Sequence, residues 1–543
     1  MDNHCLKTTL ATLENLDKKG LFDTIRGIRR GLEKESLRVT PDNHLAMTTH
    51  PMALGASLTH PHITTDFAEP LLEFITSPWS SVNGLVKQLD QIHSFTYTAL
   101  KPQHEMLWAT SMPCALPEAD QDIPIARFGN TYFGRIGSIY RHGLGLRYGR
   151  KMQTIAGVHY NFSLPESFWL SYALVKKAPL PSPGLRNFIS DQYFHLMRNV
   201  LRWRWLLPLW FGASPAIDHS FLRSEDEAKQ IPGLVKTNGS WISATATSLR
   251  LSRLGYCNSR SPAHQGVSYN GLDPFVKGLL QSLTTVSPDF AQFGIIKDGE
   301  YQQLNDTILQ IENEYYGVIR PKTLIHPGER WLNKLCERGV GHLEIRALDL
   351  NPFEPSGVSK ISLQILDLYL TACLFIDSPP LDPDEEKWRY ADYQDVVVSG
   401  RQKGFRFAPC PGSETQGDTM MQRAAPFVQI MEVLSEKFDI TLKMSDYRQA
   451  FQSAVSTIHQ PESSLSSQVI DNYAKFNNDH LAFAHHYSEQ HKAYFAEHPL
   501  TNPEMGDYRQ MASHSLARHA KLETQTEPPF AEYLEKFMKG VNT

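Results

Sequence analysis

The chain has few cysteines and none of the common cofactor-binding or hydrolase motifs. Only six of its 543 residues are cysteine, they are scattered, and no two have C-x-x-C spacing. A chain of this length with so few cysteines is not held together by disulfides, which predicts a cytoplasmic location. The P-loop, G-x-G-x-x-G, H-E-x-x-H and G-x-S-x-G patterns are also missing. A bound nucleotide would therefore have to be held by metal ions and arginines.

Long apolar runs and a strong net charge are missing as well. The most apolar internal segments, residues 201–213 and 361–376, are interrupted by polar or charged residues and are too short or too polar to span a bilayer, which needs about 20 apolar residues. We expect both to be core helices, and we expect no membrane partner. The net charge is −5, and no basic block or RNA-binding motif indicates a nucleic acid partner. The oligomeric state stays open, with a monomer as one alternative.

The sequence does contain the ordinary composition of a folded protein, with 41% hydrophobic and 20% charged residues. Strand-like and helical patterns alternate up to about residue 377, and after about residue 383 the pattern is helical and polar. This predicts an α/β (α+β) protein with a core at residues 1–382 and a helical C-terminal region at 383–543 packed on it. A single continuous domain is the alternative, because no low-complexity linker separates the two parts.

Four predicted strands carry polar side chains on one face. Side chains alternate between the two faces of a strand, so residues two apart share a face. A single face of this kind is more often simply exposed to water, but four of them together predict a sheet that holds charged ligands. The side chains that share a face are Glu33 and Glu35 (residues 32–39), His159 and Asn161 (153–163), Glu344 and Arg346 (340–348), and Gln310, Glu312, Glu314 and Tyr316 (310–316).

Another segment holds two acids on either side of a proline. Asp66 and Glu73 are an odd number of residues apart, so one straight strand would place them on opposite faces. Pro70 lies between them, and proline bends or interrupts a strand. Glu73 is surrounded by apolar residues, and an isolated buried carboxylate is costly. We therefore expect Glu73 to be paired, neutralised or bound to a metal.

The acids in unusual positions would require cations if they converged. Two carboxylates about 4 Å apart repel by roughly 4 kcal/mol at an effective dielectric near 20. Oxygen ligands suit Mg²⁺ or Mn²⁺, which bridge to substrate phosphates. His159 would ligate a metal or donate to a phosphate, although a lone histidine is more often a satisfied core residue. These acids are Glu33, Glu35, Asp66, Glu73 and Glu344.

Several long blocks closely resemble glutamate–cysteine ligase of the gammaproteobacterial type. They occur in the family's order and cover most of residues 26–377, whereas residues beyond 383 match weakly. The main blocks are RGLEKESLRV (30–39), ITTDFAEPLLEFIT (63–76), MQTIAGVHYNFSLP (152–165), FGASPA (211–216), ATSLRL (246–251), QIENE (310–314) and EIRALDLNPF (344–353).

This resemblance implies a fold and an activity. The fold would be like that of glutamine synthetase, with a curved, mainly antiparallel sheet that forms a funnel and with helices around it. The activity would be the ATP- and Mg²⁺-dependent joining of the γ-carboxylate of L-glutamate to the amino group of L-cysteine through γ-glutamyl phosphate, the first step of glutathione biosynthesis. Mn²⁺ is the alternative metal, and ATP is a co-substrate.

The resemblance also implies roles for individual residues. Arg346 would contact the transferring phosphate, so that Arg346, Glu73 and His159 are the catalytic candidates, and His159 and Arg346 would also contact the nucleotide. Residues 129–138 depart from the family's pattern and leave the glutamate pocket unassigned. The implied metal and triphosphate site is Glu33, Glu35, Asp66, Glu73, His159 and Glu344. The implied cysteine pocket is Phe67, Tyr140, Asn161, Arg250, Tyr256 and Tyr316.

Three other functions are compatible with the same residues. A sister ligase would activate glutamate for a different amine, and its phosphate release would not depend on cysteine. A metal-dependent hydrolase would turn over without ATP. A binding protein for divalent metals or amino acids would bind its ligands and release no ADP.

Overall fold

The computed structural model describes residues 3–178, 183–222, 224–229, 231–255, 266–326, 328–409, 416–524 and 528–540. Within these ranges no helix is long and apolar enough to cross a membrane. One continuous hydrophobic core extends from Leu6, in the first helix, to Ala512, near the C-terminus. The helices that follow residue 383, apart from the last one, thus share a core with the sheet and helices that precede them, and the last helix buries Phe530 and Leu534 in a smaller cluster with Ile136 and Leu304.

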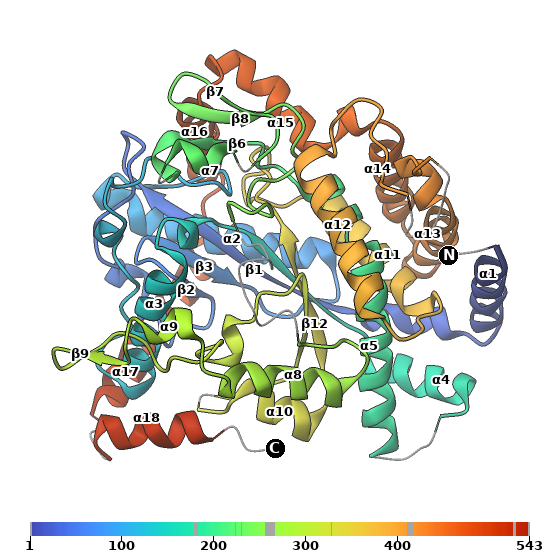
Figure 1. The fold of residues 1–543 in the computed structure, drawn as a ribbon, viewed down its shortest axis with the longest axis horizontal. Coiled ribbons are helices and arrows are strands. Elements are labelled where there is room, and N and C mark those ends of the chain that lie inside the picture. Colours follow the sequence, from blue (N-terminus) through green and yellow to red (C-terminus); the bar gives the residue numbers. More distant parts are fainter. Residues whose placement is uncertain are drawn as a thin grey trace.

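A seven-stranded sheet in which neighbouring strands pair antiparallel lies at the centre of the molecule (Figure 1). The strand order is β11-β12-β5-β1-β3-β2, and β4 also pairs with β1. This confirms the predicted mixed fold with a mainly antiparallel sheet. The strands are β1 (Arg29–Val39), β2 (Ile63–Thr65), β3 (Leu71–Ile75), β4 (Met106–Leu107), β5 (Val158–Ser163), β11 (Ile319–Lys322) and β12 (His342–Leu348).

Two small sheets lie outside this central one. The first has the order β6-β8-β7 and the second is the hairpin β9-β10. Their strands are β6 (Ala216–Asp218), β7 (Leu234–Lys236), β8 (Ser240–Ser243), β9 (Ile296–Lys297) and β10 (Glu300–Tyr301).

Helices surround the central sheet and make up most of the described chain after residue 383. Those before it are α1 (Asn3–Lys18), α2 (Val82–Leu100), α3 (Tyr132–Tyr148), α4 (Glu166–Lys176), α5 (Gly184–Trp203), α6 (Leu206–Phe211), α7 (Glu225–Lys229), α8 (Leu272–Thr284), α9 (Pro288–Ala291), α10 (Trp331–Arg338) and α11 (Lys360–Phe375). Those after it are α12 (Pro383–Ser399), α13 (Met420–Leu442), α14 (Asp446–His459), α15 (Leu465–Tyr473), α16 (His480–Glu497), α17 (Asn502–Glu523) and α18 (Phe530–Lys539).

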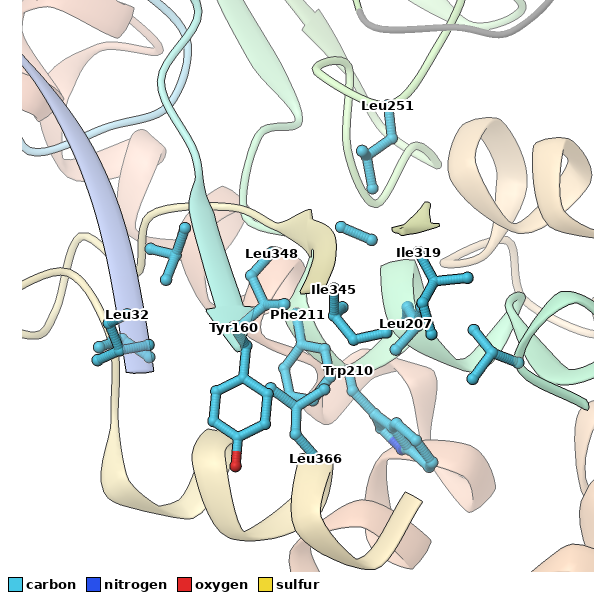
Figure 2. Close-up of a cluster of buried hydrophobic side chains, with 14 of the residues drawn as sticks. Leu32, Tyr160, Leu207, Trp210, Phe211, Leu251, Ile319, Ile345, Leu348 and Leu366 are labelled. Atoms are coloured by element: carbon cyan, nitrogen blue, oxygen red, sulfur yellow. The ribbon is translucent and has the colours of Figure 1, made fainter. Parts of the chain in front are cut away.

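One face of the sheet packs against apolar helices and so directs the other face toward the site. Leu32, Tyr160 and Ile345 belong to three neighbouring strands and meet Leu366 of α11 and Trp210 of α6 in one cluster (Figure 2). Burying each of these large side chains contributes about 1.5–3 kcal/mol. Because side chains alternate along a strand, the residues next to them, Glu33, His159 and Glu344 among them, point to the opposite side.

The helices of the C-terminal region cover two separate parts of the molecule. α13 and α14 pack against α11 on the right of Figure 1, whereas α18 packs against α3 and α17 against α2, both in red on the left. The Ser515 hydroxyl of α17 accepts a 2.9 Å hydrogen bond from the backbone N–H of Ala56. The Tyr132 hydroxyl of α3 donates to the carbonyl of Pro528, just before α18.

Two of the predicted strands differ in the structure. The strand expected at residues 153–163 begins only at Val158, because Met152–Thr154 form a 3₁₀ helix. The strand expected at residues 310–316 is wrong, because Glu312–Glu314 form a 3₁₀ turn. The backbone N–H of Gln310 donates to the Glu314 carboxylate at 2.7 Å, which curls the segment. Glu312 and Glu314 therefore do not share one strand face, and each of them contacts a different partner.

The remaining local predictions agree with the structure. Pro70 does interrupt its segment, since β2 and β3 are separate antiparallel strands on either side of it. Residues 361–376 form the buried helix α11. Residues 201–213 contain the end of α5 and the short buried helix α6.

Candidate active site

A cavity of about 260 Å³ opens on the polar face of the central sheet. Its wall contains all five acids singled out in the sequence, together with His159 and Arg346. Glu33 and Glu35 come from β1, Glu73 from β3 and Glu344 from β12, and Asp66 directly follows β2. The structure thus brings together the five acids, whose convergence the sequence analysis stated only as a condition for cation binding.

Strand register explains why these groups meet. Glu35 of β1 lies opposite Glu73 of β3, and Glu33 lies opposite His159 of β5. Glu344 of β12 lies opposite Asn161 of β5. Residues directly opposite on antiparallel strands have Cβ atoms about 4.5–5.5 Å apart, so four strands place their polar side chains in one compact group.

His159 is at the centre of the acidic group. Its Nδ1 lies 3.3 Å from Glu33 Oε2 and 3.7 Å from Glu344 Oε1, and its Nε2 lies 3.7 Å from Glu35 Oε1. Glu33, His159 and Glu344 each offer a ligand atom, and these atoms all lie within 4.8 Å of one another. The second carboxylate oxygen of Glu344 is buried without a hydrogen-bond partner. This is the arrangement expected of a cation site.

Burial and mutual repulsion shift the titration of these acids. Burial and the neighbouring Asp66 raise the pKa of Glu35 to about 8. Burial, Asp66, Glu33 and Glu35 together raise the pKa of Glu73 well above its ordinary value. Burial opposes the ionisation of Glu344 too, but Lys322 and Arg346 hold its pKa well below the ordinary value. In the protein alone, burial and repulsion thus favour the neutral forms of Glu35 and Glu73, and a bound cation would favour their charged forms.

A second group of side chains makes the other part of the wall basic. Arg346 Nη1 donates to Glu344 Oε1 at 3.0 Å, and Lys322 Nζ lies 3.5 Å from Glu344 Oε2. Burial and the nearby Arg346 lower the pKa of Arg320 to about 10, which still leaves it charged at neutral pH. The basic residues on the wall are Arg141, Arg250, Arg320, Lys322 and Arg346.

Sequence reasoning assigned no site role to three of these basic residues. Arg320 and Lys322 lie two apart in β11 and share a face by the period-two rule, so the signal was present but unused. Arg141 comes from the middle of α3, where its Nε donates to the carbonyl of Asp66. No periodicity in a helix reveals that it faces a sheet made by other segments.

The predicted cysteine-pocket residues divide into three groups. Phe67, Tyr140, Tyr316 and Arg250 line the cavity. Asn161 is not on the wall, and instead its amide nitrogen donates to Glu33 Oε1 at 2.9 Å. Tyr256 lies outside the described residues. The structure therefore places four of the six on the cavity wall and one in contact with an acid of that wall.

Arg250 reaches the cavity because a glycine leaves room for it. A Cβ atom on Gly157 would lie 2.1 Å from Arg250 Nη2, closer than any real contact. The guanidinium is buried, donates from Nη2 to the carbonyl of Arg346 at 3.1 Å, and lies 3.6 Å from Asp349. Arg250 is thus a cavity residue that is also held by an acid, not a surface arginine.

The C-terminal region also contributes to the wall. Tyr390 and Tyr393 of α12 line the cavity. The guanidinium of Arg204, buried beneath them, lies 5.0 Å from the ring centre of Tyr390 and 5.9 Å from that of Tyr393. Part of the site therefore comes from residues beyond 382.

The sequence and the fold are similar to those of glutamate–cysteine ligases. The profile of the glutamate–cysteine ligase family matches residues 13–396. The glutamate–cysteine ligase of Alcanivorax borkumensis is 40% identical over 95% of this chain and 96% of its own length, and that of Edwardsiella ictaluri is 38% identical over 95% and 97%. A crystal structure of the Francisella tularensis enzyme in complex with AMP has a TM-score of 0.85 and 32% identity, covering 94% of this chain and 98% of that one.

A more distant likeness concerns the fold alone. A bifunctional glutathione synthetase from Pasteurella multocida matches with a TM-score of 0.69 and 22% identity, over 90% of this chain and 55% of that one.

Fold, cavity and relatives together define the class as ATP-dependent ligases that join a carboxylate to an amine. Within that class the chain belongs to the glutamate–cysteine ligase family, which catalyses the first step of glutathione biosynthesis.

Proposed function

We propose that the cavity activates the γ-carboxylate of L-glutamate with ATP, as γ-glutamyl phosphate, and then transfers the glutamyl group to the amino group of L-cysteine. The observation that carries this proposal is the pairing of an acidic group with a basic group on one cavity wall. Acids suit metal-bound phosphates, and guanidinium groups suit the carboxylates and phosphates of the substrates. A hydrolase or a simple binding site would not need both groups next to an aromatic pocket.

The residues present fit divalent metal ions. Three ligand atoms lie within 4.8 Å of one another, and one oxygen of Glu344 has no hydrogen-bond partner. Mostly oxygen donors with one histidine match Mg²⁺ or Mn²⁺. Bound there, such ions would neutralise the triphosphate charge. The residues proposed to hold them are Glu33, Glu35, Asp66, Glu73, His159 and Glu344.

The surroundings of Arg346 support its proposed role in the phosphoryl step. The attacking carboxylate and the triphosphate are both anions, so positive charge must lie where they approach each other. Arg346 is fixed by its 3.0 Å hydrogen bond to Glu344 Oε1 and lies next to His159, with 3.4 Å between Arg346 Nη1 and His159 Nδ1. Burial and Arg346 lower the pKa of His159, which keeps the imidazole neutral and able to accept or donate one hydrogen bond.

The second step needs a neutral amine and no nucleophile from the protein. Either a cavity carboxylate or the departing phosphate accepts the proton of the cysteine amine. Among the described cysteines, Cys5, Cys114, Cys336 and Cys373, none is on the cavity wall. We assign the acceptor site to Phe67, Tyr140, Arg250 and Tyr316, with Tyr256 and Asn161 completing the assignment made from the sequence.

The experiment that tests this function is ADP release in the presence of glutamate, with the second amino acid varied. We expect rapid release with cysteine and slow release with alanine, serine or no acceptor. Equal rates with and without an amine would indicate a hydrolase. Glutamate-dependent release that prefers another amine would indicate a sister ligase.

A separate experiment tests the metal site. Glu73→Gln replaces a charged ligand by a neutral amide oxygen, so it should lower turnover about tenfold or more and raise the Mg²⁺ concentration required, in line with the effect of disturbing metal sites. Glu69→Gln is the matched control, because Glu69 is a nearby buried acid that accepts from the backbone of His50 and Arg127 outside the cavity. Normal turnover of Glu73→Gln at ordinary magnesium would remove Glu73 from the site.

We also propose a cytoplasmic protein in which residues 1–382 form the catalytic core and the helical region at 383–543 completes it. The two α12 tyrosines on the cavity wall support a helical region that completes the core. The described cysteines, which are free thiols, support the cytoplasmic location.

A further inference from the structure

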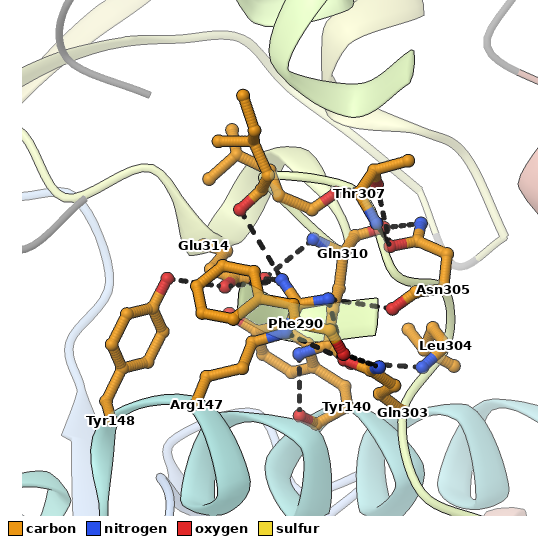
Figure 3. A network of polar contacts seen from close by, with 12 residues as sticks. Tyr140, Arg147, Tyr148, Phe290, Gln303, Leu304, Asn305, Thr307, Gln310 and Glu314 are labelled. Carbon is orange, nitrogen blue, oxygen red and sulfur yellow. Dashed lines mark hydrogen bonds and ion pairs between the residues drawn. The ribbon is translucent and has the colours of Figure 1, made fainter. Parts of the chain in front are cut away.

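A buried polar network lies behind the proposed cysteine pocket, between α3 and the segment 303–314 (Figure 3). Arg147 Nη1 donates to Glu314 Oε1 at 3.1 Å, and neither side chain has any exposed area. The hydroxyl of Tyr148 donates to the same Glu314 oxygen at 2.8 Å. Neither Arg147 nor Glu314 is on the cavity wall, so this ion pair has no direct contact with the cavity.

The arginine is saturated by protein groups. Its Nε and Nη2 donate to Gln303 Oε1 at 3.0 and 2.9 Å, and Nη2 also donates to the carbonyl of Asn305 at 2.7 Å. Its guanidinium lies 4.3 Å from the ring centre of Phe290. An arginine with Nε and both terminal nitrogens engaged is built to hold segments together rather than to bind a ligand.

Gln310 joins the same network to the helix that carries Tyr140. Its amide nitrogen donates to the carbonyl of Tyr140 at 3.2 Å, and its amide oxygen accepts from the backbone N–H of Leu304 at 3.0 Å. A Cβ atom on Gly143 would lie 2.3 Å from that amide oxygen. The glycine in α3 is therefore what allows the glutamine to lie against the helix.

The network has cavity residues at both of its ends. Tyr140 is on α3, seven residues before Arg147, and Tyr316 follows the 3₁₀ turn that contains Glu314. Both tyrosines line the cavity, and the Tyr316 and Tyr148 rings meet edge-on with centroids 6.4 Å apart. The separation of the two tyrosines is thus fixed by Glu314, Arg147 and Gln310.

We propose that Glu314, Arg147 and Gln310 are positioning residues that set the affinity for the amino-acid acceptor by holding Tyr140 and Tyr316 at a fixed separation. This proposal rests on the proposed function, because it takes these tyrosines as part of the cysteine site. The network lies on the α3 side, whereas Arg346 and the acids belong to the sheet. Loss of the network should therefore change acceptor binding and leave nucleotide binding nearly intact.

The test is steady-state kinetics of Glu314→Gln. This change keeps the shape of the side chain but leaves Arg147 buried without its counter-charge. We expect KM for cysteine to rise about fivefold to tenfold and KM for ATP to change less than about twofold, since a misplaced binding group weakens only the ligand that it touches. Unchanged KM for cysteine, or equal changes for both substrates, would overturn the proposal.

The matched control is Glu105→Gln. Glu105 is also a buried acid paired with a buried arginine, Arg38. This pair lies at the C-terminal end of β1. A purely structural effect of losing a buried ion pair would appear in both variants as a lower midpoint of unfolding. Only Glu314→Gln should also raise KM for cysteine.

Two further variants keep the test decisive. If Glu314→Gln does not fold, Gly143→Ala applies a milder disturbance by displacing the Gln310 amide, and the same split between the two KM values is expected. Tyr316→Ala tests the acceptor pocket itself. If Tyr316→Ala leaves KM for cysteine unchanged, the proposed pocket is wrong; if it raises KM while Glu314→Gln and Gly143→Ala do not, only the positioning role is wrong.

Discussion

The two faces of strand β1 handle charge in opposite ways. On the face toward the helices, Arg30 is paired with Asp367 at 2.8 Å, and Arg38 with Glu105. On the face toward the cavity, Glu33 and Glu35 lie among other acids whose repulsion contributes to the raised pKa values of Glu35 and Glu73. The charges on the helix face are balanced within the protein. The acids on the cavity face repel one another instead, so the strand is a structural element on one side, and we propose it as a binding element on the other.

Lys34 shows that the helix face disfavours a charge that has no opposite charge beside it. It lies between Glu33 and Glu35 in sequence but points the other way, where its Nζ is 3.1 Å from His93 Nε2 of α2. Burial alone lowers the pKa of Lys34 to about 7. The charged form of a group without an acid beside it is thus disfavoured on this face. On the cavity face, neighbouring cations are available to balance a charge, and bound substrates would also be available.

The largest expected effect is a loss of folding free energy when the Arg30–Asp367 ion pair on the helix face is broken. Asp367 accepts from Arg30 Nε, from the Tyr160 hydroxyl at 2.6 Å and from the Tyr447 hydroxyl at 2.7 Å. Asp367→Asn removes the counter-charge of a buried arginine, which costs about 3–5 kcal/mol of folding free energy. Urea unfolding measures this loss. KM values of the folded variant should stay normal, and a small stability change would contradict the comparison.

The next largest effect is expected on the cavity face. Arg346→Ala removes a positive charge from the place where we propose that two anions react, so kcat should fall about 100-fold to 1,000-fold. KM for cysteine should change little. Arg346→Lys should restore part of the rate, because it keeps the charge and loses the forked geometry. Turnover of Arg346→Ala within tenfold of the unaltered enzyme would exclude a role in the phosphoryl step.

A smaller effect is expected from Arg250, which has contacts with both the protein and the cavity. A guanidinium–carboxylate contact contributes about 1.5–3 kcal/mol, so Arg250→Ala should raise KM for cysteine about tenfold or more. KM for ATP should barely change. Arg253→Ala is the matched control, because Arg253 is exposed three residues later. If the two variants behave alike, the acceptor pocket has been assigned to the wrong residues.

The smallest expected effect is a loss of folding stability at acidic pH. Burial, with a contribution from Arg38, lowers the pKa of His50 to about 3. Below pH 6.5 the unfolded chain therefore binds a proton that the folded chain does not, and stability falls as pH falls. Between pH 6.5 and 5.5 this loss is roughly 1 kcal/mol. His50→Gln should reduce the slope of unfolding free energy against pH in that range.

Alternation along single strands was enough to predict which side chains of β1 and of β12 share a face. Glu33, Glu35 and Glu344 could be assigned to faces because the period of a strand is local and register then brings the faces together. The turn at 312–314 could not be predicted in this way. Glu312 pairs with Arg330 and Glu314 with Arg147, and these partners come from distant segments that no local pattern reveals. Arg141 and Tyr390 were missed for the same reason, since helices bring them to the cavity from outside the sheet.

The strand order of the central sheet has a consequence for how the protein is made. Strand β5 lies between β1 and β12, and β12 follows it by almost 180 residues in the chain. Synthesis proceeds at about 5–20 residues per second, so β5 emerges roughly 9–36 seconds before its second neighbour exists. During that time one edge of β5 offers unpaired backbone groups, which is the usual starting point for pairing with another chain. Strand β12, which brings Glu344 and Arg346 to the cavity, therefore also covers this open edge of β5.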